Sequence, residues 1–381
     1  MALVTHNVIP SDGQGRVCYE LVRYLCGAGH QVHVYANRVD PGLPQWAGVT
    51  WHRVPVWLEK PNLLKCIEFM VRATFMLMGH RYGVVHVNGA VALVRHHVNT
   101  AHFVHRAWLA GGFREVPGLR GSYHRLYRHV NSWLEAVVFR RACRIVAVSP
   151  KVSTEILSSV SLPAERVQCI NNGCDTPQPP LAPHTRQELR QQLWPGLSPD
   201  DLLVGFAGDI VTTRKGVDTV IRAMVRLRGE PVRLVVAGAT QSSPYPATVT
   251  ELGLESQVRF LGFRRDLSRV FQALDCFVFP TRYDTFGLVA TEAAAAGSPL
   301  LLSNPTFCGA AGLFRDGDSA LFIHDPADDR EVAEGLLHLL RNPVERRRLG
   351  AAAQGTAAGW TWEQMGQAYV NLYRTVLKGE G

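Results

Sequence analysis

Short runs of apolar residues alternate with helical patterns along the first half of the chain. The run at residues 2–5 is followed by a turn with glycines and by an amphipathic pattern, whose apolar face carries Val17, Leu21, Val22 and Leu25. Gly27 and Gly29 are expected to end that helix. Further apolar runs occupy residues 32–36, 84–87, 98–101, 144–148 and 167–170. Because buried strands alternate with helices, this pattern predicts βαβ units and a parallel sheet.

The composition changes between residues 175 and 185, where the chain reads DTPQPPLAPHT. This stretch is rich in proline and poor in large apolar residues, which is typical of a linker. Beyond it the alternation restarts, with apolar runs at residues 203–207, 234–237, 258–261, 276–280, 300–303 and 321–323. The sequence therefore predicts an α/β protein with two Rossmann-like domains, at residues 1–178 and 186–359, that face each other across a cleft.

The 381 residues carry a formal net charge of +8, which favours anionic partners such as phosphates. No run of Lys and Arg is long enough to serve as a nucleic-acid arm, so a nucleic-acid partner is not expected. The eight cysteines form no Cys-x-x-Cys pair, which indicates a reducing compartment and neither a zinc site nor a disulfide framework. The N-terminus does not have the pattern of a signal peptide, so a cytoplasmic location is expected.

In an open parallel sheet, ligands bind beyond the carboxyl ends of the strands, so the residues that follow each predicted strand are candidates. Gly13 and Gly15 follow the first strand and would let the start of a helix approach a ligand closely. His102 follows the strand at residues 98–101, where it could hydrogen-bond a substrate hydroxyl. The alternative is a structural or solvated histidine, since the chain has 15 of them.

The first predicted strand of the second domain is followed by Gly208 and Asp209, and Arg214 and Lys215 open the next predicted helix. A cationic pair at a helix N-terminus suits a diphosphate, because the helix dipole and the side-chain charge act in the same direction. The alternative is an ordinary exposed basic pair.

The segment at residues 280–297, PTRYDTFGLVATEAAAAG, carries the strongest signal. It predicts a strand that ends at Pro280 and a helix that begins near Phe286, with Asp284 in the loop and Glu292 inside an otherwise apolar helix. A carboxylate in such a helix either faces a polar ligand or costs desolvation energy. Two carboxylates beside a helix start suit a sugar nucleotide, with the backbone amides available to its phosphates.

In combination these motifs resemble those of the retaining GT-B glycosyltransferases of family four, over nearly the whole chain. The resemblance rests on Gly13 and Gly15 and on motifs at residues 84–86, 100–102, 146–150, 171–175, 214–216 and 284–292. It implies a last helix, within residues 360–381, that crosses back to the first domain. It also implies a reaction that retains the anomeric configuration and needs neither a metal nor another cofactor.

The resemblance implies a role for each matching position. Lys215, with Arg214, would bind the diphosphate, and Glu292 would bind the nucleotide ribose. Asp284 and His102 would contact the donor sugar, and these two residues and Lys215 are the candidate catalytic residues. The remaining donor-binding candidates are Gly13, Gly15, Gly208, Asp209, Thr285, Phe286, Gly287 and Leu288.

Two positions depart from the family pattern. Asp209 stands where the family usually has an arginine, which removes one expected cation for the diphosphate. Asp284 replaces the first glutamate of the family's Glu-x7-Glu pattern, so the charge is kept on a side chain that is one methylene shorter.

The sequence therefore predicts a hexosyltransferase that uses a UDP- or GDP-sugar and a hydroxyl of a saccharide, lipid-linked or small-molecule acceptor. Three alternatives stay open. The first is a degenerate protein that binds a sugar nucleotide without turnover, and the second is a nucleotide-sugar epimerase of the same fold. The third is a bilobed solute-binding protein, which the absence of a signal-peptide pattern and the carboxylate of Glu292 disfavour.

Residues 122–141 allow two interpretations. An apolar stripe is formed by Leu126, Val130, Trp133, Leu134, Val137 and Val138, and positive charge is supplied by Arg125, Arg128, His129, Arg140 and Arg141. The stripe either packs into the core, with a solvated basic face, or binds an anionic membrane as an interfacial helix. The second interpretation would place the protein peripherally at the inner face of the membrane.

Overall fold

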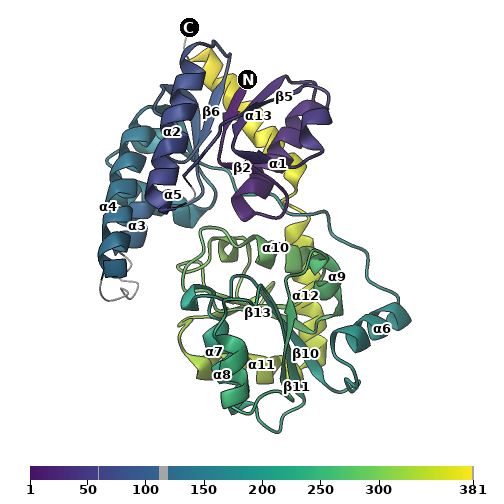
Figure 1. Ribbon diagram of the computed structural model, residues 1–381. Helices are drawn as coiled ribbons and strands as arrows, with labels where there is room; N and C mark the ends of the chain where they lie inside the picture. Colours follow the sequence, from purple (N-terminus) through teal and green to yellow (C-terminus); the bar gives the residue numbers. More distant parts are fainter. Residues whose placement is uncertain (59, 111–118, 380–381) are drawn as a thin grey trace. The chain divides into compact units, whose positions relative to one another are not determined.

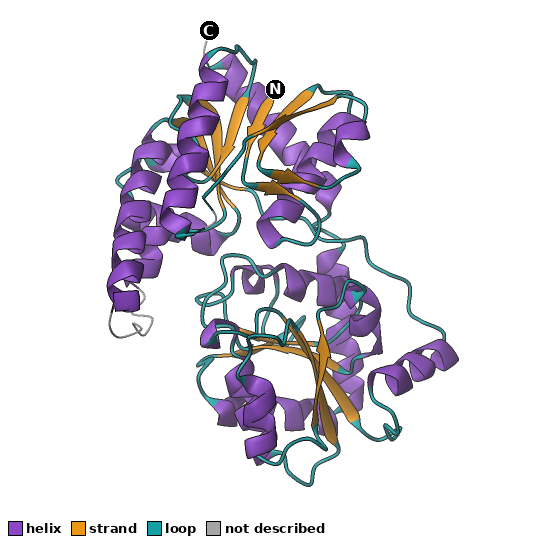
Figure 2. Cartoon of the chain, viewed as in Figure 1, coloured by secondary structure: helices purple, strands orange, loops and turns teal. Residues whose placement is uncertain are grey.

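The chain forms two compact domains in a computed structural model that describes residues 1–58, 60–110 and 119–379. The first domain comprises Met1–Gly173 and the chain from Trp362 onward, and the second comprises Cys174–Thr361 (Figure 1). Each domain is built around a parallel sheet with helices on its faces (Figure 2). The predicted fold class is confirmed: the chain is α/β, with two Rossmann-like domains and a last helix that belongs to the first of them.

The first domain holds a seven-stranded parallel sheet in the order β5-β3-β1-β6-β7-β8-β9. Its strands are β1 (Ala2–Val4), β3 (Val32–Ala36), β5 (Val49–Arg53), β6 (Val85–Asn88), β7 (His96–Ala101), β8 (Ala142–Ala147) and β9 (Val167–Cys169). A separate parallel pair is formed by β2 (Asn7–Val8) and β4 (Arg38–Val39). The carboxyl ends of β1, β6 and β7 therefore meet at one edge of the larger sheet.

The helices of the first domain are amphipathic. They are α1 (Gly13–Gly27), α2 (Asn62–Met78), α3 (His105–Ala110), α4 (Leu119–Arg140), α5 (Pro150–Ser159) and α13 (Trp362–Lys378), with short 3-10 turns at Leu43–Gln45 and Ala164–Arg166. On α1 the predicted apolar face is confirmed, because Val17, Leu21, Val22 and Leu25 are all buried.

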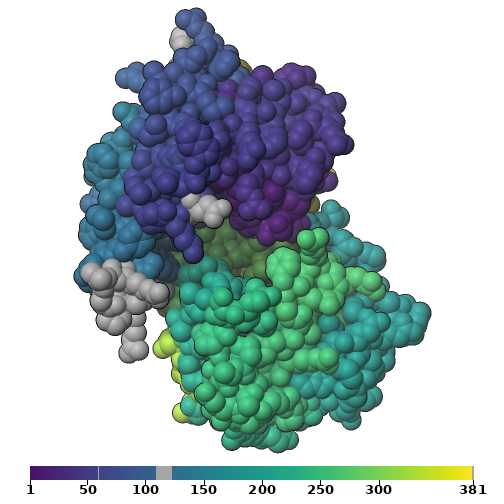
Figure 3. All heavy atoms as spheres, viewed as in Figure 1, coloured from purple at the N-terminus to yellow at the C-terminus, as the bar shows by residue number. Residues whose placement is uncertain are grey.

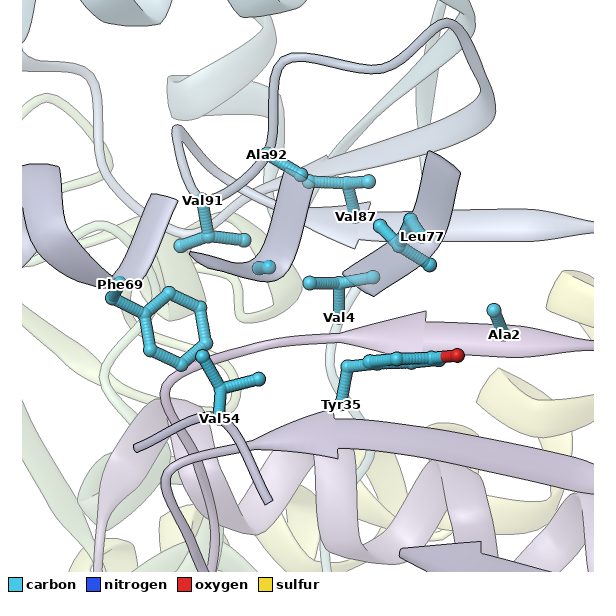
Figure 4. Close-up of a cluster of buried hydrophobic side chains, with 10 residues drawn as sticks. Ala2, Val4, Tyr35, Val54, Phe69, Leu77, Val87, Val91 and Ala92 are labelled. Carbon is cyan, nitrogen blue, oxygen red and sulfur yellow. The ribbon is translucent and has the colours of Figure 1, made fainter. Parts of the chain in front are cut away.

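The core of the first domain includes a cluster between α2 and the sheet (Figure 4). Phe69 and Leu77 of α2 pack with Val4 of β1, Tyr35 of β3 and Val87 of β6. Complete burial of side chains of this size stabilises the domain by roughly 1.5–3 kcal/mol each. This packing fixes the strands whose ends carry the candidate site.

The last helix is held in the first domain by close packing and by hydrogen bonds. A Cβ added to Gly366 would lie 2.3 Å from the Tyr24 side chain of α1, so glycine allows the two helices to approach closely. Tyr369 lies 2.9 Å from the Thr100 hydroxyl, and the Tyr373 hydroxyl lies 2.8 Å from His86 Nδ1. These contacts tie α13 to β6 and β7.

The second domain holds a six-stranded parallel sheet in the order β12-β11-β10-β13-β14-β15. Its strands are β10 (Leu202–Ala207), β11 (Val232–Ala237), β12 (Val258–Gly262), β13 (Cys276–Phe279), β14 (Leu300–Ser303) and β15 (Leu321–Ile323). Its helices are α6 (Pro183–Leu193), α7 (Val217–Arg226), α8 (Tyr245–Glu251), α9 (Leu267–Ala273), α10 (Leu288–Ala295), α11 (Asp329–Arg341) and α12 (Pro343–Ala357), with 3-10 turns at Thr213–Lys215 and Gly309–Leu313.

The apolar stripe of residues 122–141 is divided in the structure. Leu134 and Val138 of α4 are buried, whereas Leu126 and Trp133 are exposed. The stripe therefore does not form one interfacial face, and its C-terminal part belongs to the core. Among the described residues, no helix combines the length and the apolar character that crossing a bilayer requires.

Candidate active site

The candidate residues of the second domain gather at the carboxyl edge of its sheet. β10 and β13 are neighbouring parallel strands, so the loops that follow them meet. Gly208 follows β10, and a Cβ added to it would lie 3.8 Å from the Lys215 side chain. The loop after β13 carries Asp284, and its main chain is tied to the other loop because Arg282 N–H donates to the Arg214 carbonyl at 2.9 Å.

Lys215 and Asp284 form the central contact of this edge. The ammonium of Lys215 donates to Oδ2 of Asp284, and the two side chains are only 12% and 13% exposed. The same ammonium lies 5.5 Å from the centre of the Phe279 ring. Sequence analysis proposed both charged residues as separate ligand contacts, and the structure brings them together as a largely buried ion pair.

The backbone around Lys215 depends on a glycine. Gly216 has φ +80°, and a Cβ at this position would lie 1.9 Å from the Pro280 carbonyl oxygen. This close approach joins the Lys215 loop to the end of β13. Arg214 and Lys215 lie in the 3-10 turn, and α7 begins only at Val217, so the prediction that they open the helix itself is wrong by one turn.

The loop after β13 turns sharply into α10. The backbone N–H of Phe286 donates to Asp284 Oδ1 at 3.3 Å, and Gly287 caps the helix with φ +100°. α10 begins at Leu288, two residues later than predicted, because Phe286 and Gly287 form this turn. The N-cap residue, Gly287, supplies no side-chain cap, and the start of a helix offers backbone N–H groups to an anion. Glu292 is half-buried on the same helix, and Thr285 lies in the loop.

Asp209, which replaces the arginine of the family pattern, organises its own loop. Its Oδ1 accepts the Val211 N–H at 2.9 Å, and its Oδ2 lies 4.0 Å from Arg214 Nη2. The side chains of Asp209 and Arg214 are 40% and 33% exposed, so this contact is weak and solvent-screened. Arg214 is therefore partly neutralised in this structure, and Lys215 is the better buried of the two predicted cations.

A second ion pair, between Arg282 and Asp218, was missed in the sequence. Arg282 makes a bidentate contact with Asp218 at 2.7 and 2.8 Å, which fastens the loop after β13 to α7. Burial opposes ionisation of Asp218, but the hydrogen bonds from Arg282 and Arg222 outweigh it and lower the pKa of that carboxyl. The contact joins residues that are 64 apart in sequence, so no local pattern could have revealed it.

The first-domain candidates lie at the carboxyl edge of the other sheet. His102 follows β7, and its Nε2 lies 3.2 Å from Oδ1 of Asn88, the last residue of β6. Gly15 lies in the first turn of α1, where an added Cβ would be 3.0 Å from the Ile9 carbonyl oxygen, whereas Gly13 has open space around it. Asn88 was not among the predicted residues, although it directly follows the apolar run at residues 84–87.

Burial keeps the imidazoles near this edge neutral. It lowers the pKa of His102 and of His6 to about 4, and that of His86 to about 3. His86 is completely buried and lies 2.8 Å from both the Tyr373 hydroxyl and the Thr100 hydroxyl. This edge therefore offers uncharged hydrogen-bonding groups, in contrast to the paired charges of the second domain. Within the described residues, no cluster of three or more His, Cys, Asp or Glu side chains could hold a metal ion.

Two family models match the chain and together cover most of it. The model for glycosyl transferases group 1 matches residues 188–356, and the model for Glycosyltransferase Family 4 matches residues 11–178. The D-inositol 3-phosphate glycosyltransferase of Mycobacterium marinum is 30% identical over 318 residues, which are 81% of this chain and 64% of that relative. The chain thus spans a little less than two thirds of the length of this relative.

Solved structures share the fold. WaaG, a glycosyltransferase involved in lipopolysaccharide biosynthesis, has a TM-score of 0.81 at 22% identity, over 98% of this chain and 99% of WaaG. Anabaena HepE in complex with UDP-glucose has a TM-score of 0.76 at 20% identity, over 98% of this chain and 99% of HepE. The two-domain architecture and both family models define a GT-B glycosyltransferase. The chain belongs to the glycosyl transferases of group 1, with an N-terminal half of the family-4 type.

Proposed function

We propose that this glycosyltransferase moves a hexose from a UDP- or GDP-sugar to a hydroxyl, with retention of anomeric configuration and without a metal ion. The observation that carries the proposal is the Lys215–Asp284 pair beside the uncapped start of α10. A buried ammonium next to backbone N–H groups suits the diphosphate of a donor, and a carboxylate suits the sugar hydroxyls. Glu292, on the same helix, would take the ribose hydroxyls, as the family resemblance implies.

In the proposed reaction, Lys215 and the N–H groups of the first turn of α10 stabilise the charge that builds up on the departing diphosphate. Groups that are already oriented cost no reorganisation when that charge develops, which is how electrostatic preorganisation lowers a barrier. Asp284 holds Lys215 in place before the donor binds. The acceptor hydroxyl attacks the anomeric carbon on the face from which the diphosphate leaves, so the configuration is retained.

The donor and acceptor are chosen for testing by what the relatives bind or are named for. UDP-hexoses come first because HepE was solved with UDP-glucose, and GDP-hexoses follow. Inositol phosphate joins the saccharide and lipid-linked acceptors, because a relative is named for it. Proton NMR of each mixture in EDTA should show a product whose anomeric configuration equals that of the donor. An inverted product, or turnover that requires added metal, would overturn the proposal.

Asp209 favours a second candidate, a protein that binds the sugar nucleotide without transferring the sugar. Its carboxylate stands at the diphosphate edge of the second domain, close to Arg214. Saturable nucleotide-sugar binding without transfer or hydrolysis would support this candidate. Conversion of the donor sugar in the absence of any acceptor would instead support the epimerase.

We also propose a peripheral contact with an anionic membrane on the cytoplasmic side, made by α2 and the segment before it together with the exposed part of α4. Phe75 and Met78 of α2 are each 70% exposed and Trp57 is 76% exposed. Arg72 stacks its guanidinium over Trp57 at 4.0 Å but is paired with Glu68 at 2.9 Å. The positive charge would therefore come from the exposed Arg125 and Arg140 of α4. Figure 3 shows α2 on the surface that faces the viewer. Apolar side chains interspersed with cations are typical of an interfacial surface.

Co-sedimentation with anionic vesicles tests this contact. The double variant Phe75→Ser, Met78→Ser should lose binding, whereas Val344→Ser should keep it, because Val344 is equally exposed (71%) on α12 of the second domain. Zwitterionic vesicles should bind the wild-type protein more weakly. Absence of wild-type binding to anionic vesicles would remove the membrane contact from the account.

A further inference from the structure

The first domain contains two pairs of asparagine and histidine near β6 and β7, and they differ in whether the amide donor has a partner. In the first pair, His96 lies on β7 with Asn99 three residues further on. In the second, His102 follows β7 and Asn88 ends β6. Both asparagines are almost completely buried, with 0% exposure for Asn99 and 2% for Asn88.

In the pair of His96 and Asn99, both ring nitrogens and the amide donor have partners within the protein. His96 Nδ1 lies 2.9 Å from the Val94 carbonyl oxygen, so this nitrogen carries the proton and donates it. Its Nε2 is then an acceptor, and Asn99 Nδ2 donates to it at 3.1 Å. Asn99 Nδ2 also donates to the Gly89 carbonyl at 3.1 Å. Both hydrogens of that amide are used within the protein, whereas its oxygen, Asn99 Oδ1, is buried without a partner among the described residues.

The pair of Asn88 and His102 is open. His102 Nε2 lies 3.2 Å from Asn88 Oδ1, which can only accept, so this nitrogen carries the proton. His102 Nδ1 is then left as an acceptor, and no hydrogen bond ties it to the described parts of the chain. Asn88 Nδ2 is buried and has no partner among the described residues. A buried donor without a partner costs about 1–3 kcal/mol, so such groups are normally satisfied.

The groups without a partner are a donor, Asn88 Nδ2, and an acceptor, His102 Nδ1. A hydroxyl group of a ligand can accept from the first and donate to the second. The same edge is where the parallel sheet directs ligands, because β1, β6 and β7 all end there. His102 as a whole is half-buried, so part of this residue is reachable from outside the protein. His86, whose charge would interact with that of His102, is itself held neutral by burial, which lowers its pKa to about 3.

We propose that Asn88 is a positioning residue for His102. Oδ1 of Asn88 holds His102 in the Nε2–H tautomer, and Nδ2 of Asn88 donates to an oxygen of the hydroxylated ligand that His102 binds. The ligand part of this inference rests on the proposed function and on the family resemblance, which implies that His102 contacts the donor sugar. The tautomer part does not, since it concerns the free protein. Asn88 acts through the imidazole and through one hydrogen bond, and it takes no part in bond breaking.

The tautomer is measured by long-range ¹H–¹⁵N correlation spectra of the full chain with ¹⁵N-labelled histidine, at pH 7.5 and without ligand. The His102 signals are assigned by their loss in His102→Gln. His102 should show the Nε2–H pattern and His96 the Nδ1–H pattern in the same spectrum. In Asn88→Ala, His102 should lose this preference, whereas the matched control Asn99→Ala should change His96 and leave His102 unaltered. An Nδ1–H tautomer of His102 in the wild-type protein would overturn the proposal.

Calorimetric titration then tests the proposed contact between Asn88 and the ligand independently of the tautomer. Asn88→Ala should leave the Kd for the nucleoside diphosphate alone unchanged and raise the Kd for the intact sugar nucleotide about tenfold, the usual scale for one hydrogen bond lost to a buried group. Asn88→Asp keeps the acceptor and adds a charge, so it should hold the tautomer and raise the pKa of His102. Equal Kd values for the sugar nucleotide in the wild-type protein and Asn88→Ala contradict the ligand part. If no nucleotide binds the wild-type protein, the proposed function fails while the tautomer result stands.

Discussion

The two sheets end in edges of opposite electrostatic character. The edge of the second domain is built from charges that are paired, Lys215 with Asp284 and Arg282 with Asp218. At the edge of the first domain, the ends of β6 and β7 carry an amide and a neutral imidazole, Asn88 and His102. The carboxylate of Asp12, at the start of α1, accepts a hydrogen bond from Asn7. The difference teaches that one topology, an open parallel sheet, sets only the place of a site. The chemistry comes from a few side chains that follow the strands.

Charged and neutral edges suit different chemical groups. A diphosphate needs fixed positive charge and backbone donors, which the second domain supplies. Hydroxyl groups need donors and acceptors without a net charge, which the first domain supplies. The same difference makes the two domains respond differently to acid, to loss of a charge and to loss of a hydrogen bond.

The largest difference between the two domains is expected in their response to acid. In the first domain, burial lowers the pKa of His6, His86, His96 and His102 to about 3–4, well below the usual value of 6.5. Below pH 6.5 these histidines bind protons in the unfolded chain but stay neutral in the folded protein. The free energy of unfolding therefore falls as the pH drops from 6.5 towards 4. Each histidine contributes up to about 1.4 kcal/mol per pH unit.

The carboxyl groups of the second domain lose their stabilising effect in a different, more acidic pH range. The pKa of Asp218 and of Asp275 lies below the usual 3.8, because contacts with arginines outweigh burial. Their stabilisation is present above pH 3.8 and is lost only as the pH falls further. Hydrogen-exchange protection factors should therefore fall for β6 and β7 between pH 7 and 5.5, and hold for β13 and β14. Equal losses in both domains would break the comparison.

Loss of the central cation should have the next largest effect. Lys215→Ala should lower kcat/KM for the sugar nucleotide by about 100- to 1,000-fold, because it removes charge stabilisation and leaves Asp284 buried without its partner. Lys151→Ala is the matched control, since Lys151 pairs with Glu155 at a similar exposure (10% and 13%) on α5. If the two variants have equal activity, Lys215 does not act on the donor.

The third largest effect is expected from substitution of Gly216, the glycine that allows the two loops of the second domain to approach closely. Gly216→Ala puts a Cβ against the Pro280 carbonyl in addition to the left-handed backbone, so it should lower the free energy of unfolding by about 3 kcal/mol. Gly253→Ala has a similar φ of +61° with open space around it and should cost only about 1–2 kcal/mol. Urea denaturation of both variants measures the difference, and equal costs would show that the close approach to Pro280 is unimportant.

The neutral network of the first domain should show the smallest effect. Tyr373→Phe removes the hydroxyl beside His86 Nδ1 and should cost about 1–2 kcal/mol of unfolding free energy. Tyr24→Phe removes an exposed hydrogen bond to Gln367 and should stay within about 0.5 kcal/mol. Thermal unfolding of the two variants compares these costs. A larger loss in Tyr24→Phe would mean that the buried network does not hold α13.

Much of the fold could be predicted because central strands of parallel sheets are continuous apolar runs. All six strands of the second domain were placed within two residues of their ends. β5, with the sequence VTWHR, was missed because it is an edge strand and partly exposed, so it carries no apolar run. The positions of Lys215 and Asp284 followed from the rule on strand ends, but their pairing did not, because it joins residues 69 apart. Asn88 obeys the same rule and was overlooked, since an asparagine after a strand is also common in turns.

We propose above that the second domain binds a nucleoside diphosphate at the sheet edge that carries Lys215. A thermal-shift panel of UDP, GDP, ADP and dTDP and their common sugars, in EDTA, tests it most directly. We expect a UDP or GDP compound to raise the melting temperature of the wild-type protein and of Lys151→Ala, and we expect Lys215→Ala to lose most of this shift. No shift with any nucleotide, or an undiminished shift in Lys215→Ala, would contradict it.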